Sequence, residues 1–523
     1  MKSKEILLNL IEKGILVNPD IMDKEIDSDF LNNLINHYGS ELDILDETKL
    51  EEFKKINEQK NSSITIIKNY TKPPKKRSYQ DFVSVINRRF ETISNILMIR
   101  QDMIGTSSIS RVMQKNSDEQ ISIIGMVLEK NITKNNNYVL KLEDKTGICT
   151  VIIKNDERNK ELVSIVDDVS LDEIIGVIGK KFNDAIFAQK IIFPDIPPTK
   201  ELKKQKEEEY LAILGDIHFG SKVFMKEEFE KFIEWTKGEY GSPEQREIAN
   251  KLKYIIHTGD LVEGVGVYPS QEDDLEIIDI KKQYSQAAEW LKKIPKHIEI
   301  IMISGNHDAG RLAEPQEPLP KDITEPLWNM SNMTILSNPS VVNIGKTKDF
   351  PGFDCLLYHG GSLIYYSENI PNIRAAGGQK RSDLIMKYLL QRRHLAPTHG
   401  STLYIPDKDV DPLIIDIVPD FFITGHIHRA SVKNYRNITM INGSCWTQTT
   451  DDQIKRGLEP QPARLPLINL RTRNVKMLNF MSKKTKEKEE EILKELKEQK
   501  EKEEKELKEK LKQIKDSEIT TNQ

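Results

Sequence analysis

The sequence predicts an α/β fold whose buried strands end in metal-ligand residues, preceded by a β-barrel and a small helical module. Two observations predict this organisation. Between residues 210 and 423, apolar runs of strand length are each followed by glycine or a short polar cluster, whereas residues 118–196 hold shorter strand-like runs joined by turns. The apolar runs of the first kind are Tyr210–Leu214, Tyr254–Ile256, Ile300–Ile303, Cys355–Tyr358 and Phe421–Ile423.

Length and composition limit the class of protein. At 523 residues the chain exceeds one compact core and predicts roughly three units. The net charge of -5, from 77 basic and 82 acidic residues, gives no overall attraction to nucleic acid, so any such contact needs a local basic patch. The cysteines Cys149, Cys355 and Cys445 lie far apart, which predicts core residues in a reducing compartment.

The sequence contains neither a predicted membrane-spanning segment nor a predicted signal peptide. No apolar stretch reaches the roughly 20 residues that a membrane-spanning helix needs. The N-terminus lacks the pattern of a signal peptide. We therefore expect a soluble, cytoplasmic protein without a membrane partner.

Residues 1–55 are predicted to form a small N-terminal helical module. An apolar stripe at helical spacing covers residues 4–13 and ends at Gly14. A second short helix is indicated by a further apolar group at Phe30, Leu31, Leu34 and Ile35.

Residues 56–81 are polar and then basic, and we interpret them as a linker. The basic stretch 72–77 favours a solvated connector, with contact to a phosphate backbone as the alternative. Residues 82–117 are predicted to be an amphipathic helix and a connector, because Phe82, Ile86, Phe90, Ile93 and Leu97 recur every three or four residues. The apolar face of this helix needs a partner, so the helix and the following barrel are candidate surfaces for a second subunit.

Residues 118–196 are predicted to form an OB-type β-barrel. Five short strands with turns between them in about 80 residues are typical of such a barrel. Few aromatic residues, mainly Tyr138 and Phe187, occur in these strands, which favours a packing or protein-interface role over binding of single strands. The predicted strands are Ile121–Val127, Tyr138–Leu142, Cys149–Ile153, Glu173–Ile178 and Ala185–Ala188.

The remaining chain divides into three parts by composition. Residues 197–209 form a charged linker, and residues 210–481 contain the strand runs and their polar clusters. Residues 482–523 are low in complexity and rich in lysine and glutamate, which predicts a marginal solvated helix. Binding of a partner by this tail is the alternative.

The polar clusters contain the residues that bind divalent metals. One triplet of this kind occurs by chance in many proteins, and a lone histidine is more often a core residue than a ligand. Five of the ten histidines, however, lie in these clusters, in the order that a two-metal phosphoesterase requires. His257 is predicted to be structural, and His37 and His297 to be surface residues. The clusters are Gly215–His218, Gly259–Asp260, Gly305–Asp308, His359–Gly361 and Gly425–His428.

The types of ligand indicate hydrolysis of a phosphodiester. Two metals about 3.5 to 4 Å apart neutralise the anionic oxygens and activate a water. Asp260 is the natural bridge between the metals, and the neutral oxygen of Asn306 leaves the site with positive charge for the substrate. His307 is predicted to act on the scissile phosphate as a donor or general acid, with Asp308 orienting it. Asp216, His218 and His428 are assigned to one metal, and Asn306, His359 and His426 to the other.

This series of clusters resembles the calcineurin-like metallophosphoesterases. Residues 259–269 and 393–400 are further similar to the small subunits of the archaeal D-family DNA polymerases. The resemblance implies a four-layer α-β-β-α phosphoesterase sandwich with a preceding OB-type barrel. It also implies a proofreading 3′ to 5′ exonuclease on single-stranded or mispaired primer ends, with a large catalytic subunit as partner in a heterodimer or heterotetramer. Manganese is the metal that similar nucleases favour, and iron and zinc suit the same ligands.

Two other functions stay open. A non-catalytic scaffold subunit is disfavoured because every ligand is present, whereas related eukaryotic B subunits have lost theirs. A phosphatase or phosphodiesterase acting on small esters is disfavoured by Glu263, which stands where such enzymes often carry arginine.

Nucleic-acid contacts are predicted near the last two ligand clusters. The basic residues there either bind the DNA backbone or form a solvated surface. Tyr365, Tyr366 and Trp446 are candidates for stacking on a base, with ordinary packing favoured. The basic residues are Arg374, Lys380, Arg381, Arg392 and Arg393.

Overall fold

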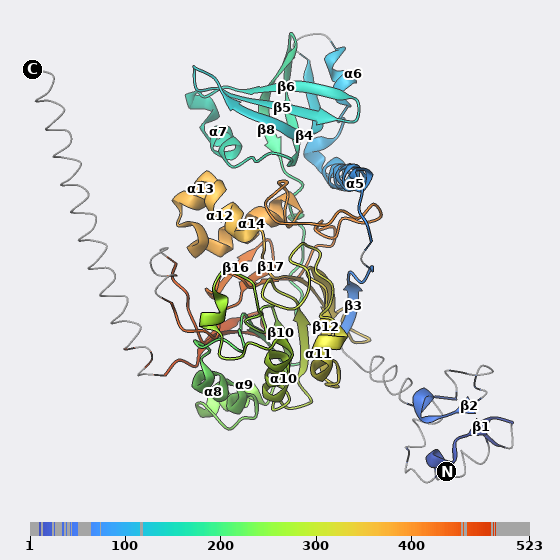
Figure 1. Ribbon diagram of the computed structural model, residues 1–523. Helices are drawn as coiled ribbons and strands as arrows, with labels where there is room; N and C mark the ends of the chain where they lie inside the picture. The colour runs from blue at the N-terminus through green and yellow to red at the C-terminus, as the bar shows by residue number, and fades with distance from the viewer. Residues whose placement is uncertain are drawn as a thin grey trace, which may run out of the picture. The chain divides into compact units, whose positions relative to one another are not determined.

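The structure, a computed structural model, divides into two units (Figure 1). One unit comprises Met1–Thr65 and Asn343–Gly352, and the other comprises Ile66–Val342 and Phe353–Gln523. The described residues are 64–115 except 74, 119–450, 453, 458–482, 485 and 487, together with 10, 11, 14–22, 26, 34, 35, 38, 42 and 44–50.

The N-terminal unit contains a two-stranded parallel sheet that the sequence did not predict. Strands β1 (Leu16–Val17) and β2 (Ile44–Leu45) pair, and helix α2 (Pro19–Met22) follows β1. Strands of two residues carry no alternation that a sequence pattern can detect. Much of the two predicted helices lies outside the described residues. The apolar cluster of this unit contains Leu10, Ile21, Leu34, Leu42, Leu45 and Leu50.

The segment predicted as a basic linker contains a strand and fixed ion pairs. Residues Ile64–Lys68 form β3, at the edge of a six-stranded sheet, because isoleucine and threonine at these positions favour extended backbone. Lys72 Nζ lies 2.9 Å from Asp407 Oδ1 and 3.1 Å from Asp409 Oδ2. The interpretation of 56–81 as a solvated connector is therefore wrong for its described residues, 64–73 and 75–81.

All five strands predicted for the barrel are present and form a closed barrel in the order β4-β5-β6-β8-β7. The strands are antiparallel except for β6 and β8. Their inward side chains, with those of helices α6 and α7, form one apolar core. The elements are α6 (Ile109–Met113), β4 (Gln120–Ile132), β5 (Tyr138–Asp144), β6 (Gly147–Ile153), η3 (Glu157–Asn159), α7 (Lys160–Asp167), β7 (Ile174–Phe182) and β8 (Ala185–Ile192).

The first six-stranded sheet has the order β12-β11-β10-β9-β18-β19. Strands β9 to β12 are parallel, while β18 and β19 are antiparallel additions. Aromatic residues of helix α8 and apolar residues of α9 to α11 form its core. The elements are β9 (Tyr210–Leu214), α8 (Lys226–Thr236), α9 (Pro243–Ala249), β10 (Leu252–His257), η4 (Gln271–Asp274), α10 (Ile280–Leu291), β11 (Glu299–Ile303), α11 (Lys321–Trp328), β12 (Met333–Leu336), β18 (Arg464–Asn469) and β19 (Val475–Asn479).

The second six-stranded sheet has the order β16-β17-β15-β14-β13-β3. Strands β14, β15 and β17 are parallel, and β16 is antiparallel to β17. Helices α12 to α14 pack on it, on the side nearest the barrel (Figure 1). The elements are β13 (Ser340–Ile344), β14 (Phe353–Tyr358), α12 (Leu363–Asn369), α13 (Pro371–Ala375), η5 (Gly378–Arg381), α14 (Ser382–Arg392), β15 (Phe421–Thr424), β16 (Ser431–Tyr435) and β17 (Ile438–Asn442).

Helix α5 (Tyr79–Met98) covers the predicted amphipathic segment, and the 3-10 turn η2 (Gln101–Met103) follows it. Its Ile93 and Leu97 pack in a cluster with Ile174 of the barrel and with Ile414, which lies between α14 and β15. The C-terminal part of the apolar face is thus covered from within the chain, whereas Ile86 is 38% exposed. The helix as a surface for a second subunit stays a prediction.

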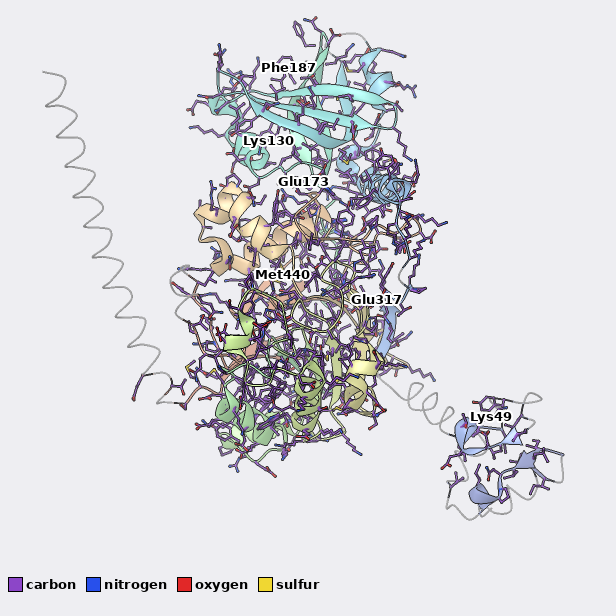
Figure 2. All side chains as sticks on the ribbon, viewed as in Figure 1. Lys49, Lys130, Glu173, Phe187, Glu317 and Met440 are labelled. Atoms are coloured by element: carbon purple, nitrogen blue, oxygen red, sulfur yellow. The ribbon has the colours of Figure 1, made fainter. Side chains whose placement is uncertain are left out.

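A buried polar group joins the barrel to helix α14. Figure 2 labels Glu173 at the edge of the barrel that faces this helix. Its carboxylate accepts a hydrogen bond from the hydroxyl of Tyr388, and Oε2 lies 3.3 Å from Nε of Arg392. The contact fixes the barrel to the second sheet's helices. Among the described residues, no helix has the length and apolar character that crossing a bilayer requires.

Candidate metal centre

The predicted ligands come from loops at the ends of two different sheets. Strands β9, β10 and β11 of the first sheet lead into Asp216 with His218, Asp260, and Asn306. Strands β14 and β15 of the second sheet lead into His359 and into His426 with His428. All five predicted strands before these clusters are present. The structure therefore brings together residues that are up to about 200 positions apart, because parallel strands present their carboxyl ends at one edge.

The first group of candidate ligands contains Asp216, His218 and His428. His218 Nε2 lies 3.2 Å from His428 Nε2, and His428 Nε2 lies 3.8 Å from Asp216 Oδ1. His428 Nδ1 is buried without a hydrogen-bond partner among the described residues. Imidazole nitrogens and a carboxylate oxygen that face one another at these distances fit a shared cation.

The second group contains Asp260, His359 and His426, with Asn306 beside it, and a third group that overlaps both contains His218, Asp260 and His307. His359 Nε2 lies 2.9 Å from Asn306 Oδ1 and 3.4 Å from Asp260 Oδ2. The same Asp260 oxygen lies 3.9 Å from Nε2 of His218 in the first group. Asp260 therefore stands between the two groups, in the position that a bridging ligand needs.

Oxygen atoms of neighbouring residues lie close to the Nδ1 atoms of three histidines of the site and orient their rings. His359 Nδ1 lies 2.8 Å from the carbonyl oxygen of Thr258, and His307 Nδ1 lies 2.8 Å from the carbonyl oxygen of Glu263. His218 Nδ1 lies 3.0 Å from Glu263 Oε2 and forms an ion pair with it rather than a hydrogen bond. Metal-binding histidines characteristically donate their second N–H to an acceptor, as His359 does here, which leaves Nε2 for the metal. The donor set thus fits a pair of divalent ions.

The backbone of the ligand loops is strained. Asp216, His218, Asp260, His426 and His428 all have positive φ values, between 31° and 67°. Side-chain-bearing residues rarely adopt this conformation, and it concentrates at functional sites where the surrounding structure enforces it. Such clustering at five of the seven predicted ligands supports a functional role for these loops.

Glycine is required beside the bridging position. Gly259 has φ +98°, and a Cβ there would lie 2.7 Å from Nδ1 of His359 and 2.8 Å from Cα of Gly305. Both neighbours belong to ligand loops. The absence of a side chain therefore allows strands β10, β11 and β14 to bring their ends together.

The charge state of the site follows from burial and close carboxylates. Burial lowers the pKa of His218, but the Glu263 carboxylate outweighs it and raises the pKa to about 9. Burial likewise opposes protonation of His359, and Asp260 overcomes it and raises the pKa to about 10. At His426 burial prevails and lowers the pKa to about 3. In the metal-free protein, His218 and His359 are thus protonated beside buried carboxylates. Divalent cations would bind in the same places and displace these protons.

Asp308 has a different position from the one predicted. Its carboxylate accepts hydrogen bonds from the backbone N–H of Gly305 at 2.9 Å and of Leu261 at 3.2 Å, and from the hydroxyl of Tyr284 at 3.0 Å. Among the hydrogen bonds of the described residues, none joins it to the side chain of His307. The prediction that Asp308 orients His307 is wrong, because Asp308 instead ties two ligand loops together.

Glu263 has a role in the site that the sequence did not predict. In the sequence it indicates only that no cation stands at this position, whereas in the structure its carboxylate pairs with His218 and its carbonyl oxygen faces Nδ1 of His307. Its position three residues after the bridging aspartate was the available signal, since residues that orient ligands often follow a ligand closely.

Replacing Glu263 with glutamine is expected to weaken manganese binding by about 10- to 100-fold, because the amide no longer offers His218 a charged acceptor. Isothermal titration calorimetry of the metal-free protein measures this affinity without any substrate. The matched control is Glu272→Gln, an exposed glutamate nearby. Equal affinities of the Glu263 variant and the control would contradict the orienting role.

The predicted basic contacts divide into buried and exposed residues. Arg392 and Arg393 are buried, so their prediction as DNA contacts is wrong. Arg392 stacks on Tyr388 and pairs with Glu173, and Arg393 Nε donates to the carbonyl oxygen of Ile415 at 2.6 Å.

The remaining three basic residues lie on the surface formed by α13 and η5. Arg374 is exposed. Arg381 pairs with Asp383, with Nε 2.8 Å from Oδ1, and Lys380 pairs with Glu459. Their contact with DNA stays a prediction.

The three aromatic residues considered for stacking on a base are packed against the protein, which is the alternative that the sequence favoured. Tyr366 and Trp446 are fully buried, and Trp446 lies in the aromatic core with Phe229 and Phe232. Tyr365 packs partly buried against the core of the second sheet.

Known proteins are similar to this chain in sequence. Residues 210–430 match the calcineurin-like phosphoesterase family. A protein of Methanocaldococcus jannaschii named DNA polymerase II small subunit is 40% identical over 75% of this chain and 64% of its own length. Proteins of the same name from Archaeoglobus fulgidus and Thermoplasma acidophilum are 37% and 33% identical over 85% and 89% of this chain, and over 86% and 91% of their own lengths. This chain belongs to the family of DNA polymerase II small subunits.

Family membership confirms the resemblance that the ligand clusters indicated. The matched region covers 64% of the length of the Methanocaldococcus jannaschii relative and 77% of that from Methanothermobacter thermautotrophicus. The phosphoesterase family implies divalent metal binding, and the structure supplies candidate groups of ligands for it.

Proposed function

We propose that this chain is the small subunit of a two-subunit replicative DNA polymerase and that it hydrolyses single-stranded or mispaired DNA from the 3′ end with two divalent metal ions, of which manganese is favoured. The convergence of the seven predicted ligands carries the proposal. Buried imidazoles and carboxylates without a ligand between them would only destabilise the fold, so their retention argues for catalysis rather than for a scaffold. The 3′ to 5′ polarity is what the family resemblance implies.

The side chains of the site would act in distinct ways. Bound divalent ions would neutralise the phosphodiester oxygens and activate a water. The first group of ligands would hold one ion and the second group, with Asn306, the other, while Asp260 lies between them. Asp260 Oδ1 accepts a hydrogen bond from the backbone N–H of His307 at 2.8 Å, so Oδ2 is the atom that faces the metal ligands.

His307 is placed to act on the substrate. Its Nδ1 faces the carbonyl oxygen of Glu263, so Nε2 is the ring atom available to a phosphate. The protonated ring would donate to a phosphoryl oxygen and pass its proton to the departing 3′-oxygen.

Replacing His307 with alanine is expected to lower kcat on single-stranded DNA by about 10²- to 10⁴-fold, the range of a lost general acid or donor. Because His307 is not assigned to a metal, the manganese content of the purified variant should stay at that of the wild type. Manganese-dependent release of nucleotides from a 3′-labelled strand measures kcat, and His297→Ala, at an exposed histidine, is the control. Full activity of the His307 variant would remove it from the mechanism, and faster turnover of a small phosphate ester than of DNA would overturn the choice of substrate.

The assembly belongs to the same proposal. The relatives are named as the small subunit of a DNA polymerase, which supports a large catalytic subunit as partner, in a heterodimer or heterotetramer. Contact with that subunit would bring the nuclease site to a primer end.

We also propose that the barrel is of the OB type and that the phosphoesterase part is a four-layer α-β-β-α sandwich. A closed barrel of five strands with α7 between its third and fourth strands supports the first. The packing of α8 to α11 on one sheet and of α12 to α14 on the other supports the second.

A further inference from the structure

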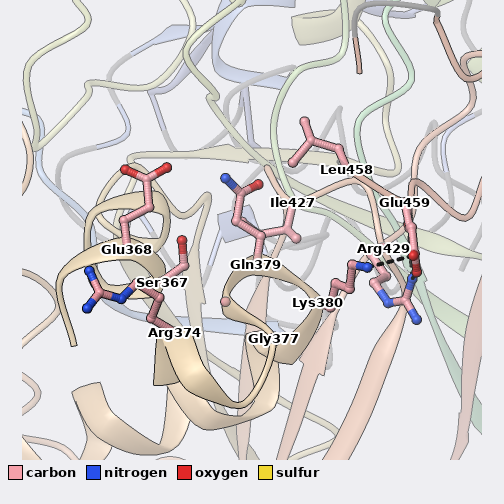
Figure 3. Close-up of a pocket in the computed structure, with 11 residues that line it drawn as sticks. Ser367, Glu368, Arg374, Gly377, Gln379, Lys380, Ile427, Arg429, Leu458 and Glu459 are labelled. Carbon is pink, nitrogen blue, oxygen red and sulfur yellow. Dashed lines mark hydrogen bonds and ion pairs between the residues drawn. The ribbon is translucent and has the colours of Figure 1, made fainter. Parts of the chain in front are cut away.

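A cavity of about 390 Å³ is connected to the candidate metal centre through one residue of its lining; Figure 3 shows the lining. The connection is made by Ile427, whose side chain lines the cavity while the residues before and after it, His426 and His428, belong to the two ligand groups. The cavity is lined by residues of α12, α13 and η5, of the loop after β15 and of the segment between β17 and β18, among them Gln379, Lys380, Ile427, Arg429, Leu458 and Glu459.

Two cations in this cavity hold one carboxylate between them. Glu459 Oε1 lies 2.6 Å from Nζ of Lys380, and Glu459 Oε2 lies 3.2 Å from Nη1 of Arg429. Figure 3 shows these three side chains together. Lys380 comes from η5 and Arg429 from the loop after β15, so the two cations converge from separate elements. A lysine and an arginine that converge on one anion also suit a phosphate group, which offers the same acceptor geometry.

The rest of the lining suits a nucleobase and sugar. Ile427 and Leu458 supply apolar surface, and Gln379 supplies an amide that can both donate and accept. The volume lies at the lower end of the range of roughly 300 to 1,000 Å³ for small-ligand sites, which admits one nucleotide unit and not a base pair. A third cation, Arg374, lines the cavity beside Glu368.

We propose that this cavity binds one nucleotide unit of a single-stranded nucleic acid, whose phosphate replaces the Glu459 carboxylate between Lys380 and Arg429. The inference rests on the proposed nuclease function and names the subsite that guides the strand past Ile427 to the metals. The side chains of Lys380 and Glu459 are 43% and 45% exposed, and ion pairs this exposed are weak. Glu459 thus acts as an internal anion that competes with the strand.

The test is binding of fluorescein-labelled dT12 to the full chain by fluorescence anisotropy in EDTA, where no hydrolysis occurs. Lys380→Ala and Arg429→Ala are each expected to raise Kd about five-fold and to reduce the slope of log Kd against log salt by about 0.7, the value for one lost phosphate contact with a single strand. Glu459→Gln is expected to lower Kd several-fold. The matched controls are Lys476→Ala and Glu244→Gln, which break an exposed ion pair between β19 and α9.

Each outcome decides the proposal. Binding by the Lys380 and Arg429 variants within two-fold of the controls would overturn it, and so would a Glu459 variant that binds no more tightly than Glu244→Gln. A loss of affinity for thymidine monophosphate as large as that for dT12 would assign the cavity to the released product and overturn the assignment to a strand. If the wild-type protein bound dT12 as expected but released no nucleotides with manganese, the nuclease proposal alone would fail.

Discussion

Replacing Asp260 with asparagine is expected to reduce manganese-dependent hydrolysis of single-stranded DNA on the order of 10³-fold or more, because two metals together contribute several kcal/mol to the transition state and Asp260 serves both. Its Oδ2 lies 3.9 Å from His218 Nε2 and 3.4 Å from His359 Nε2, one from each ligand group. An amide in this place has no charge to hold two dications together. The manganese content per chain, measured by plasma mass spectrometry, should fall together with activity.

The control for this variant is Asp273→Asn, an exposed carboxylate on η4 that should change neither quantity. Wild-type metal content and activity in the Asp260 variant would refute the bridging role. Loss of activity with the full metal content retained would instead show that Asp260 acts on the substrate and not as a metal ligand.

Replacing Asp411 with alanine is expected to destabilise the protein by about 3 to 5 kcal/mol, the cost of leaving a buried charge without its partner. Asp411 Oδ2 lies 2.8 Å from Nε of Arg89 on helix α5 and 3.2 Å from Nε2 of His394. Arg89 and Asp411 are both nearly inaccessible to solvent. Burial lowers the pKa of His394 to about 4, so Arg89 is the charge that Asp411 has to balance.

Urea unfolding followed by tryptophan fluorescence measures this effect, since all four tryptophans lie between residues 235 and 446. The double variant Arg89→Met with Asp411→Leu removes both charges and is expected to recover most of the lost stability. Glu129→Ala, which breaks the exposed pair with Lys141, is the control and should cost less than about 1 kcal/mol. A double variant as unstable as Asp411→Ala would show that packing, and not the unpaired charge, sets the cost.

The Arg89 contact also explains part of the family resemblance. The segment 393–400 is similar to the polymerase small subunits, and its first two residues, Arg393 and His394, are buried in contacts between elements. Arg393 donates to carbonyl oxygens, and His394 meets the Asp411 carboxylate that also holds helix α5. Arg393 and His394 therefore stabilise the fold. The sequence pattern alone did not distinguish this role from the DNA contact predicted for Arg393.

Local chemistry determined the strands and the ligand types. A run such as Tyr210–Leu214 or Phe421–Thr424 is buried on both faces, and burial of that kind leaves a continuous apolar signal that any reader of the sequence can detect. The identity of Asp260 or His428 as a candidate ligand likewise depends only on its atoms and its place at a strand end.

Only the tertiary structure decided which atoms face one another. That Asp260 stands between two ligand groups, that Glu263 orients His218, and that Arg392 is buried all depend on packing between segments far apart in the chain. A sequence window contains one partner of each such contact and not the other. The pairing of side chains is set by how two sheets and a barrel pack together, so it emerges only when the whole chain has folded.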